Sequence, residues 1–165
     1  LVDSLTPNLL ERLNANAYQK GAWVLHMLRH EMGDSLFKLG LQQFYTTYKY
    51  QNATSQDFAH LMDSLSPKEL APFFNQWLYQ VGHPQLKTRY FMKKDIWYFE
   101  VIQVQDELFT FPLQLKVSSD VAAPDLIEFQ VTKRKQQFEI PKELTGHEVQ
   151  ITIDPHMHLL FEPVK

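Results

Sequence analysis

The spacing of apolar residues changes near Gly82-His83-Pro84. Before this point apolar residues recur every three or four positions, which predicts amphipathic helices. Beyond it they alternate with polar residues, which predicts half-buried strands. Short connections between the expected helices indicate antiparallel neighbours. The pattern predicts an α+β chain, with an antiparallel helical bundle over residues 1–82 and a small antiparallel β-sandwich over residues 83–165.

Five helices are expected in the first half. Thr54 stands three residues before Asp57, as in a capping box, and Ser66 with Pro67 predicts a further helix start. The helices are expected after Pro7, up to Gly33, from Asp34 or Ser35, after Thr54 and after Ser66. Their apolar positions are Leu9, Leu10 and Leu13; Trp23, Val24, Met27, Leu28 and Met32; Leu36, Phe37, Leu39, Leu41, Phe44, Tyr45 and Tyr48; Phe58, Leu61, Met62 and Leu65; and Leu70, Phe73, Phe74, Trp77 and Leu78.

The second half predicts six short strands joined by turns. They are expected over residues 86–90, 96–104, 111–117, 127–131, 138–140 and 149–153. The run Lys133-Arg134-Lys135 is interpreted as a solvated turn or edge rather than a binding patch. Turn residues separate the strands at Lys94-Asp95, Asp106-Glu107, Ala123-Pro124-Asp125, Gly146-His147 and Asp154-Pro155.

Composition excludes several classes of function. Lys and Arg number 16 against 19 Asp and Glu, for a formal charge of −3, so charge provides no basis for nucleic-acid binding. The absence of cysteine excludes disulfides, thiolate zinc sites and cysteine nucleophiles. No apolar run reaches the roughly 18 residues of a membrane span. Because the chain begins with Leu1 rather than Met, we expect it to be part of a longer protein.

The histidines do not form a zinc motif. His26 and His30 stand four apart, but Met27 occupies the place that glutamate takes in H-E-x-x-H, so no general base is positioned to activate a metal-bound water. We expect a structural role for both. His156 and His158 are interpreted as part of a turn near the C-terminus. The prediction is that these 165 residues contain no metal ligands.

Tyr18 is the strongest candidate for chemistry. It stands in the expected first turn of a helix that starts within Asn14-Ala15-Asn16, where its hydroxyl could be aimed at an anionic site. The alternative from spacing alone is a buried aromatic whose O–H bonds a backbone group. Gly21 and Ala22 suit close approach of the helix to a neighbour, or simple helix packing.

Five blocks along the helical half resemble zinc aminopeptidases related to aminopeptidase N and leukotriene A4 hydrolase, the gluzincins. Their order and spacing are similar to those of the segments downstream of the zinc motif in that family. Gln19 departs from the glutamate that is usual there, and His83 stands where Tyr or Leu is common. The blocks are Tyr18-Gln19-Lys20-Gly21-Ala22, Gly33-Asp34-Ser35-Leu36-Phe37, Tyr50-Gln51-Asn52-Ala53-Thr54, Phe73-Phe74-Asn75-Gln76-Trp77 and Gly82-His83-Pro84.

The resemblance implies that the chain is the C-terminal part of a zinc-dependent aminopeptidase. It would comprise the end of a thermolysin-like catalytic domain, contributing the oxyanion-stabilising Tyr18, and the sandwich domain. Zinc, its two histidine and one glutamate ligands, and the anchors for the substrate's N-terminus would lie in an upstream catalytic half of the same polypeptide. The implied substrate is a peptide with a free N-terminus, and the fragment alone is expected to bind no zinc and hydrolyse nothing.

Two further expectations stay open. Helix faces left bare by the missing half are expected to drive self-association. A catalytically inactive homologue and a freestanding interaction module are the alternatives to an enzyme fragment. The sequence does not discriminate between cytoplasmic, periplasmic and membrane-associated locations.

Overall fold

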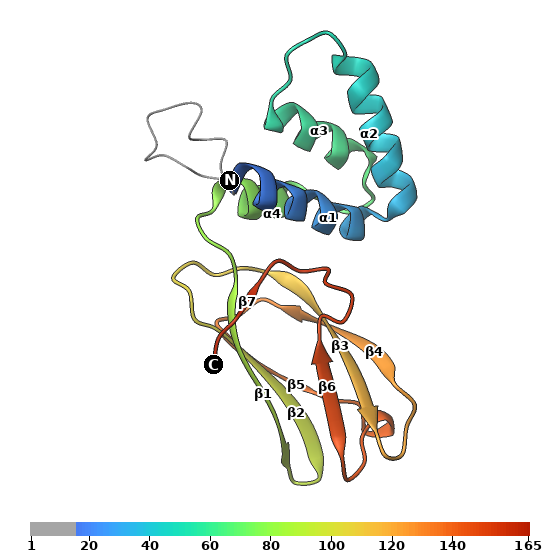
Figure 1. The fold of residues 1–165 in the computed structure, drawn as a ribbon, viewed down its shortest axis with the longest axis vertical. Coiled ribbons are helices and arrows are strands. Elements are labelled where there is room, and N and C mark those ends of the chain that lie inside the picture. The colour runs from blue at the N-terminus through green and yellow to red at the C-terminus, as the bar shows by residue number, and fades with distance from the viewer. Residues whose placement is uncertain (1–15) are drawn as a thin grey trace. The chain divides into compact units, whose positions relative to one another are not determined.

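A computed structural model describes residues 16–165, which divide into two compact units between Val81 and Gly82 (Figure 1). The first unit is helical and the second is formed by strands, so the predicted α+β class is confirmed. The expected helix after Pro7 lies outside the described residues. That the units are separate domains stays a prediction. Among residues 16–165, no helix is long and apolar enough to cross a membrane.

The helices of the first unit follow one another with short connections. Helices α1 and α2 are separated by Gly33 alone, whose φ of 80° is one that glycine adopts readily. The helices described in this unit are the π-helical turn η1 (Asn16–Lys20), α1 (Gly21–Met32), α2 (Asp34–Tyr48), α3 (Ser55–Leu65), α4 (Ala71–Phe74) and the π-helical turn η2 (Asn75–Tyr79).

Apolar side chains from α1 to α4 form the core of the helical unit. Gly40 of α2 lies against α3, and an added Cβ there would collide with the Met62 sulfur. The Phe58 ring meets the Phe44 and Phe74 rings edge-on, with centroids 5.2 and 6.3 Å apart. The buried members of this core are Leu28, Met32, Phe37, Met62, Leu70 and Phe74.

One predicted helix start is confirmed and the other is wrong. The Thr54 side chain accepts from the Asp57 N–H, and the Asp57 carboxylate accepts from the Thr54 N–H, which completes the capping box of α3. The sequence predicts that the last helix begins at Ser66 and Pro67, but α4 begins at Ala71. Ser66 Oγ accepts from the Lys68 N–H in a local turn, and the Leu70 N–H donates to the Asp63 carboxylate at 2.6 Å. These side-chain acceptors stabilise a turn there instead of a helix.

The second unit contains two sheets. One has the strand order β5-β2-β1-β7 and the other β4-β3-β6; all pairs are antiparallel except β1 with β7. The six expected strands are all present, while the short β7 was not predicted. The strands are β1 (Gln85–Lys93), β2 (Ile96–Gln103), β3 (Phe111–Ser119), β4 (Asp125–Val131), β5 (Lys135–Glu139), β6 (Val149–Ile153) and β7 (Glu162–Pro163).

The two sheets enclose the core of the β unit. Alternate residues of β3, from Phe111 to Val117, are buried as their spacing predicted. Rings also join the two sheets, because Phe129 of β4 stacks on Phe138 of β5 with centroids 4.4 Å apart. The buried Gln103 side chain satisfies both backbone groups of Phe109, accepting from its N–H and donating to its carbonyl.

Candidate functional site

Tyr18 lies in the π-helical turn η1, directly before α1. Its side chain is 64% exposed, so the buried-aromatic alternative does not hold in this structure. Single π-helical turns inside or beside α-helices are frequent at functional sites. The helix was expected to start within Asn14-Ala15-Asn16, of which the structure describes only Asn16, the first residue of η1. Lys20 closes the same turn and is half-buried, and burial lowers the pKa of its ammonium group.

Helix α1 has one buried face and one exposed face. Val24, Met27, Leu28 and Met32 are the buried residues, and they recur at helical spacing. Ala22, Leu25 and Arg29 are exposed at i, i+3 and i+7, and Leu25 retains 41% of its surface. We call Tyr18, Ala22, Leu25 and Arg29 the exposed α1 stripe. This stripe continues from the tyrosine along the helix.

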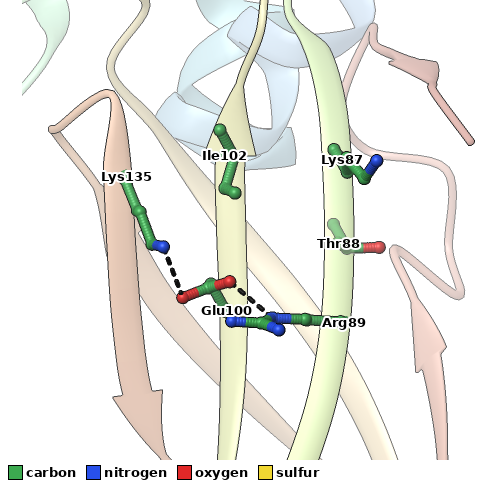
Figure 2. Close-up of a pocket in the computed structure, with 6 residues that line it drawn as sticks. All are labelled: Lys87, Thr88, Arg89, Glu100, Ile102 and Lys135. Carbon is green, nitrogen blue, oxygen red and sulfur yellow. Dashed lines mark hydrogen bonds and ion pairs between the residues drawn. The ribbon is translucent and has the colours of Figure 1, made fainter.

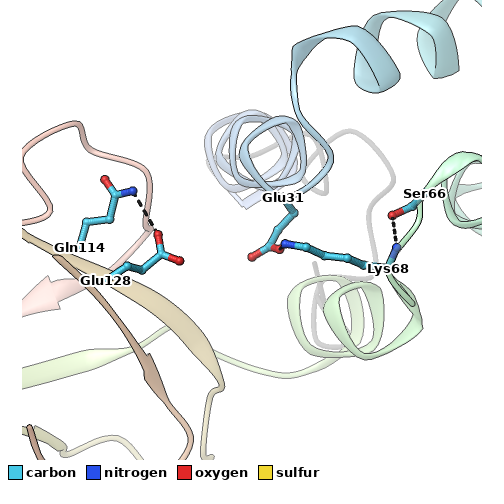
Figure 3. Close-up of polar contacts among 5 residues, drawn as sticks. All are labelled: Glu31, Ser66, Lys68, Gln114 and Glu128. Carbon is cyan, nitrogen blue, oxygen red and sulfur yellow. Dashed lines mark hydrogen bonds and ion pairs between the residues drawn. The ribbon is translucent and has the colours of Figure 1, made fainter. Parts of the chain in front are cut away.

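Two ion pairs lie at the C-terminal end of α1. Arg29 donates two hydrogen bonds of 2.7 Å to the Asp34 carboxylate across the Gly33 corner, and the Arg29 guanidinium holds the pKa of that carboxyl below its usual range. Glu31 pairs with Lys68, whose Nζ lies 3.3 Å from Glu31 Oε2 (Figure 3). The second pair joins α1 to the turn before α4. Because both pairs are largely exposed, the helix after Tyr18 is held mainly by its buried apolar face.

The described histidines are not gathered with other metal-binding side chains. His26 and His30 are exposed on α1, and the His26 ring meets Trp23 edge-on with centroids 5.7 Å apart. His156 and His158 lie in the turn after β6, where the buried Asp154 carboxylate accepts from the His158 N–H. Within residues 16–165, no group of three His, Cys, Asp or Glu side chains could hold a metal ion. The described residues therefore do not fit a zinc site.

The β unit contains a second cluster of charge, around Glu100 of β2. The Glu100 side chain is 1% exposed, although it lies on the outer face of its sheet. Its carboxylate accepts from Arg89 Nε at 2.6 Å and from the Gln137 amide, and it lies 3.2 Å from Lys135 Nζ. The Arg89 hydrogen bond, followed by that of Gln137, lowers the pKa of Glu100 to about 2. Buried carboxylates need this kind of pairing.

The Glu100 cluster is not among the sites that the sequence predicted. The run Lys133-Arg134-Lys135 is exposed where the chain enters the edge strand β5, as expected. In addition, Lys135 pairs with Glu100, and the Arg134 guanidinium donates to the Gln105 and Asp106 carbonyls. One signal was available. Glu100 is the only charged residue within the apolar segment 96–104, and such a residue is seldom buried without an ion pair.

The Glu100 cluster gives a prediction about acid stability. Because the folded pKa of Glu100, about 2, lies below the ordinary 4.5, its contribution to stability is complete above pH 4.5 and is lost as the pH falls towards 2. Glu100→Gln should therefore flatten the loss of stability across this window, whereas replacing the exposed Glu143 with Gln should not. Urea unfolding midpoints at pH 5 and pH 2.5 measure both effects. Parallel acid profiles for Glu100→Gln and the parent would contradict the assignment.

Comparison with known proteins adds sequence matches to this geometry. Residues 8–77 match the peptidase family M1 domain. The chain is 34% identical over 71 residues to aminopeptidase N of Lactococcus lactis subsp. lactis, a match covering 43% of this chain and 8% of that protein. It is 35% identical over 80 residues to probable aminopeptidase 2 of Sulfurisphaera tokodaii, covering 48% of this chain and 10% of that protein. The chain thus spans a small part of these relatives.

A solved structure matches the fold of nearly the whole chain. The crystal structure of Legionella pneumophila aminopeptidase A in complex with aspartic acid superposes with a TM-score of 0.74, over 93% of this chain and 18% of that one. Sequence identity in this match is 18%, so it supports the fold alone. The sequence matches show that the helical unit is similar to the peptidase family M1 domain, and the structural match shows that the chain as a whole has the fold of part of that aminopeptidase.

Proposed function

We propose that this chain is part of a zinc-dependent aminopeptidase of the gluzincin type, which removes N-terminal residues from peptides. The observation that carries the proposal is the position of Tyr18, exposed in a π-helical turn within the residues that match family M1. Two relatives that match a little under half of this chain are named as aminopeptidases. The zinc ligands would belong to an upstream part of the polypeptide, because the sequence contains no H-E-x-x-H.

Tyr18 would act as a hydrogen-bond donor to the substrate. A phenol keeps its proton at neutral pH and so offers one O–H to an oxygen that gains negative charge. Attack on a peptide carbonyl creates such an oxygen, and a preorganised donor stabilises it more than it stabilises the ground state. The exposed hydroxyl in η1 is free of the packed core and supports this role.

The exposed α1 stripe would contact the upstream catalytic half. A tyrosine that serves a catalytic centre supplied elsewhere requires its helix to lie against that partner, and Leu25 presents apolar surface next to it. In the chain alone this surface would stay open and favour self-association. The sandwich would have an architectural role. The preferred N-terminal residue of the substrate, the zinc content and the location are properties of the longer polypeptide.

The isolated chain provides the first test. We expect the 165 residues, with added zinc, to release no chromophore from alanyl or leucyl p-nitroanilide above the buffer rate. The physical reason is that a hydrogen-bond donor alone supplies neither a bound nucleophile nor a site for the substrate's amino group. A longer version that includes the upstream polypeptide is the positive control. If the isolated chain hydrolysed the substrate and a chelator abolished this activity, the proposal that the zinc ligands lie in upstream polypeptide would be contradicted.

A further inference from the structure

A pocket of about 290 Å³ opens on the outer face of the sheet formed by β1, β2 and β5 (Figure 2). Strand register creates it, because Ile102 pairs with Lys87 on one side and with Lys135 on the other, while Arg89 pairs with Glu100 in the next row. Three adjacent strands therefore bring their long polar side chains to one place. The lining residues are Lys87, Thr88, Arg89, Glu100, Ile102 and Lys135.

The lining of this pocket carries more positive than negative charge. It contains three cations and one carboxylate, so two positive charges are in excess, although the chain as a whole has a formal charge of −3. Glu100 lies beneath the cations with 1% of its side chain exposed, and Arg89 and Lys135 remain 64% and 56% exposed. The charged groups that solvent reaches are therefore the cations rather than the carboxylate. A local excess of one sign attracts ions of the opposite sign.

Two of these cations have donors available to a ligand. Among residues 16–165, the structure gives the Lys87 ammonium no hydrogen bond or ion pair. Arg89 uses Nε for Glu100, which leaves its terminal nitrogens for another acceptor. The Arg89 guanidinium also lies over the Phe91 ring, 5.0 Å from its centroid, which restricts its motion. The guanidinium is thus held in place before any ligand binds.

We propose that this pocket binds a small oxyanion with two negative charges, the chemistry of inorganic phosphate or of the phosphate group of a monoester. Arg and Lys donors bind phosphate oxygens, Arg through its planar fork and Lys as a point charge. The two excess charges match a dianion. The volume of 290 Å³ is at the lower limit of ordinary ligand pockets, so a small ligand fits better than an extended one.

Backbone amide NMR of the 165-residue protein tests this proposal. Titration with inorganic phosphate should produce saturable shifts on β1, β2 and β5, while chloride at matched ionic strength should not. Sulfate, as a second dianion, should compete. A separate titration with glycerol phosphate distinguishes free phosphate from a phosphate monoester. Equal affinity for the two ligands indicates that the pocket recognises the phosphate group alone. Tighter binding of glycerol phosphate indicates that the organic part also contacts the pocket.

Two matched variants distinguish phosphate binding in the pocket from a general effect of surface charge. Lys87→Gln should raise the phosphate dissociation constant about fivefold, the scale of one exposed charge contact. Lys93→Gln removes an exposed cation from the same strand and face, outside the pocket lining, and should change binding less than twofold. Lys87 has no side-chain partner among the described residues, so its replacement should leave the fold intact. Absence of saturable binding, or equal losses in both variants, would overturn the proposal.

Discussion

Replacing Tyr18 with Phe in the longer enzyme is expected to lower turnover about a hundredfold or more. A single oxyanion donor is worth roughly 2.7–4 kcal/mol of activation free energy, and the substitution removes the hydroxyl while keeping the ring. Because the hydrogen bond strengthens as charge develops on the attacked carbonyl oxygen, kcat should fall much more than KM changes. Steady-state hydrolysis of an alanyl or leucyl substrate measures both constants.

Two controls make this result specific to the hydroxyl of Tyr18. Tyr45→Phe removes a hydroxyl from a tyrosine that is 71% exposed on α2 of the same unit, and it should leave turnover within twofold. Zinc content, measured on the purified variants, should be equal to that of the parent, because Tyr18 is proposed to contact the substrate rather than the metal. Unchanged turnover of Tyr18→Phe would remove the assignment. A loss shared by both variants would instead indicate a general effect on the helical unit.

Replacing Phe74 with Ala is expected to destabilise the helical unit by about 3–5 kcal/mol, the range for large-to-small changes in a core. Phe74 is 4% exposed, and its ring meets Phe73 and Phe58 edge-on with centroids 5.5 and 6.3 Å apart. The variant loses this burial and leaves a cavity that neighbouring helices fill only in part. Urea unfolding followed by circular dichroism at 222 nm measures the change.

Tyr45→Ala is the matched control for the core substitution. It truncates an aromatic of similar size that is 71% exposed, so its effect should stay within about 0.5 kcal/mol. A loss below about 1 kcal/mol for Phe74→Ala would show that α4 does not complete the core. This matters for the proposed function, because the same core contains Leu28 and Met32 of α1, the helix directly after the turn that holds Tyr18.

Local patterns in the sequence were sufficient for most elements. Capping depends on neighbours three residues apart, so Thr54 and Asp57 identified the start of α3 correctly. Alternation depends only on which side chains face the core, so the positions of β3 were identified too. The start of α4 was wrong because Asp63, seven residues before Leu70, provides the acceptor for its N–H. No periodic pattern encodes a hydrogen bond of that span.

The sequence by itself determined the α+β order of elements, because the spacing of apolar residues is a local property of the chain. Through its resemblance to a family it also singled out Tyr18, because the motif around this residue is short and continuous. The tertiary structure alone decided that the Tyr18 ring is exposed, that Glu100 is buried, and that Lys87, Arg89 and Lys135 surround one pocket. These properties depend on register between strands and on packing between helices. The ion pairs of Glu100 with Arg89 and Lys135 join positions that are far apart in the chain. The free energy of these pairs depends on how deeply Glu100 is buried, and residue spacing does not specify burial.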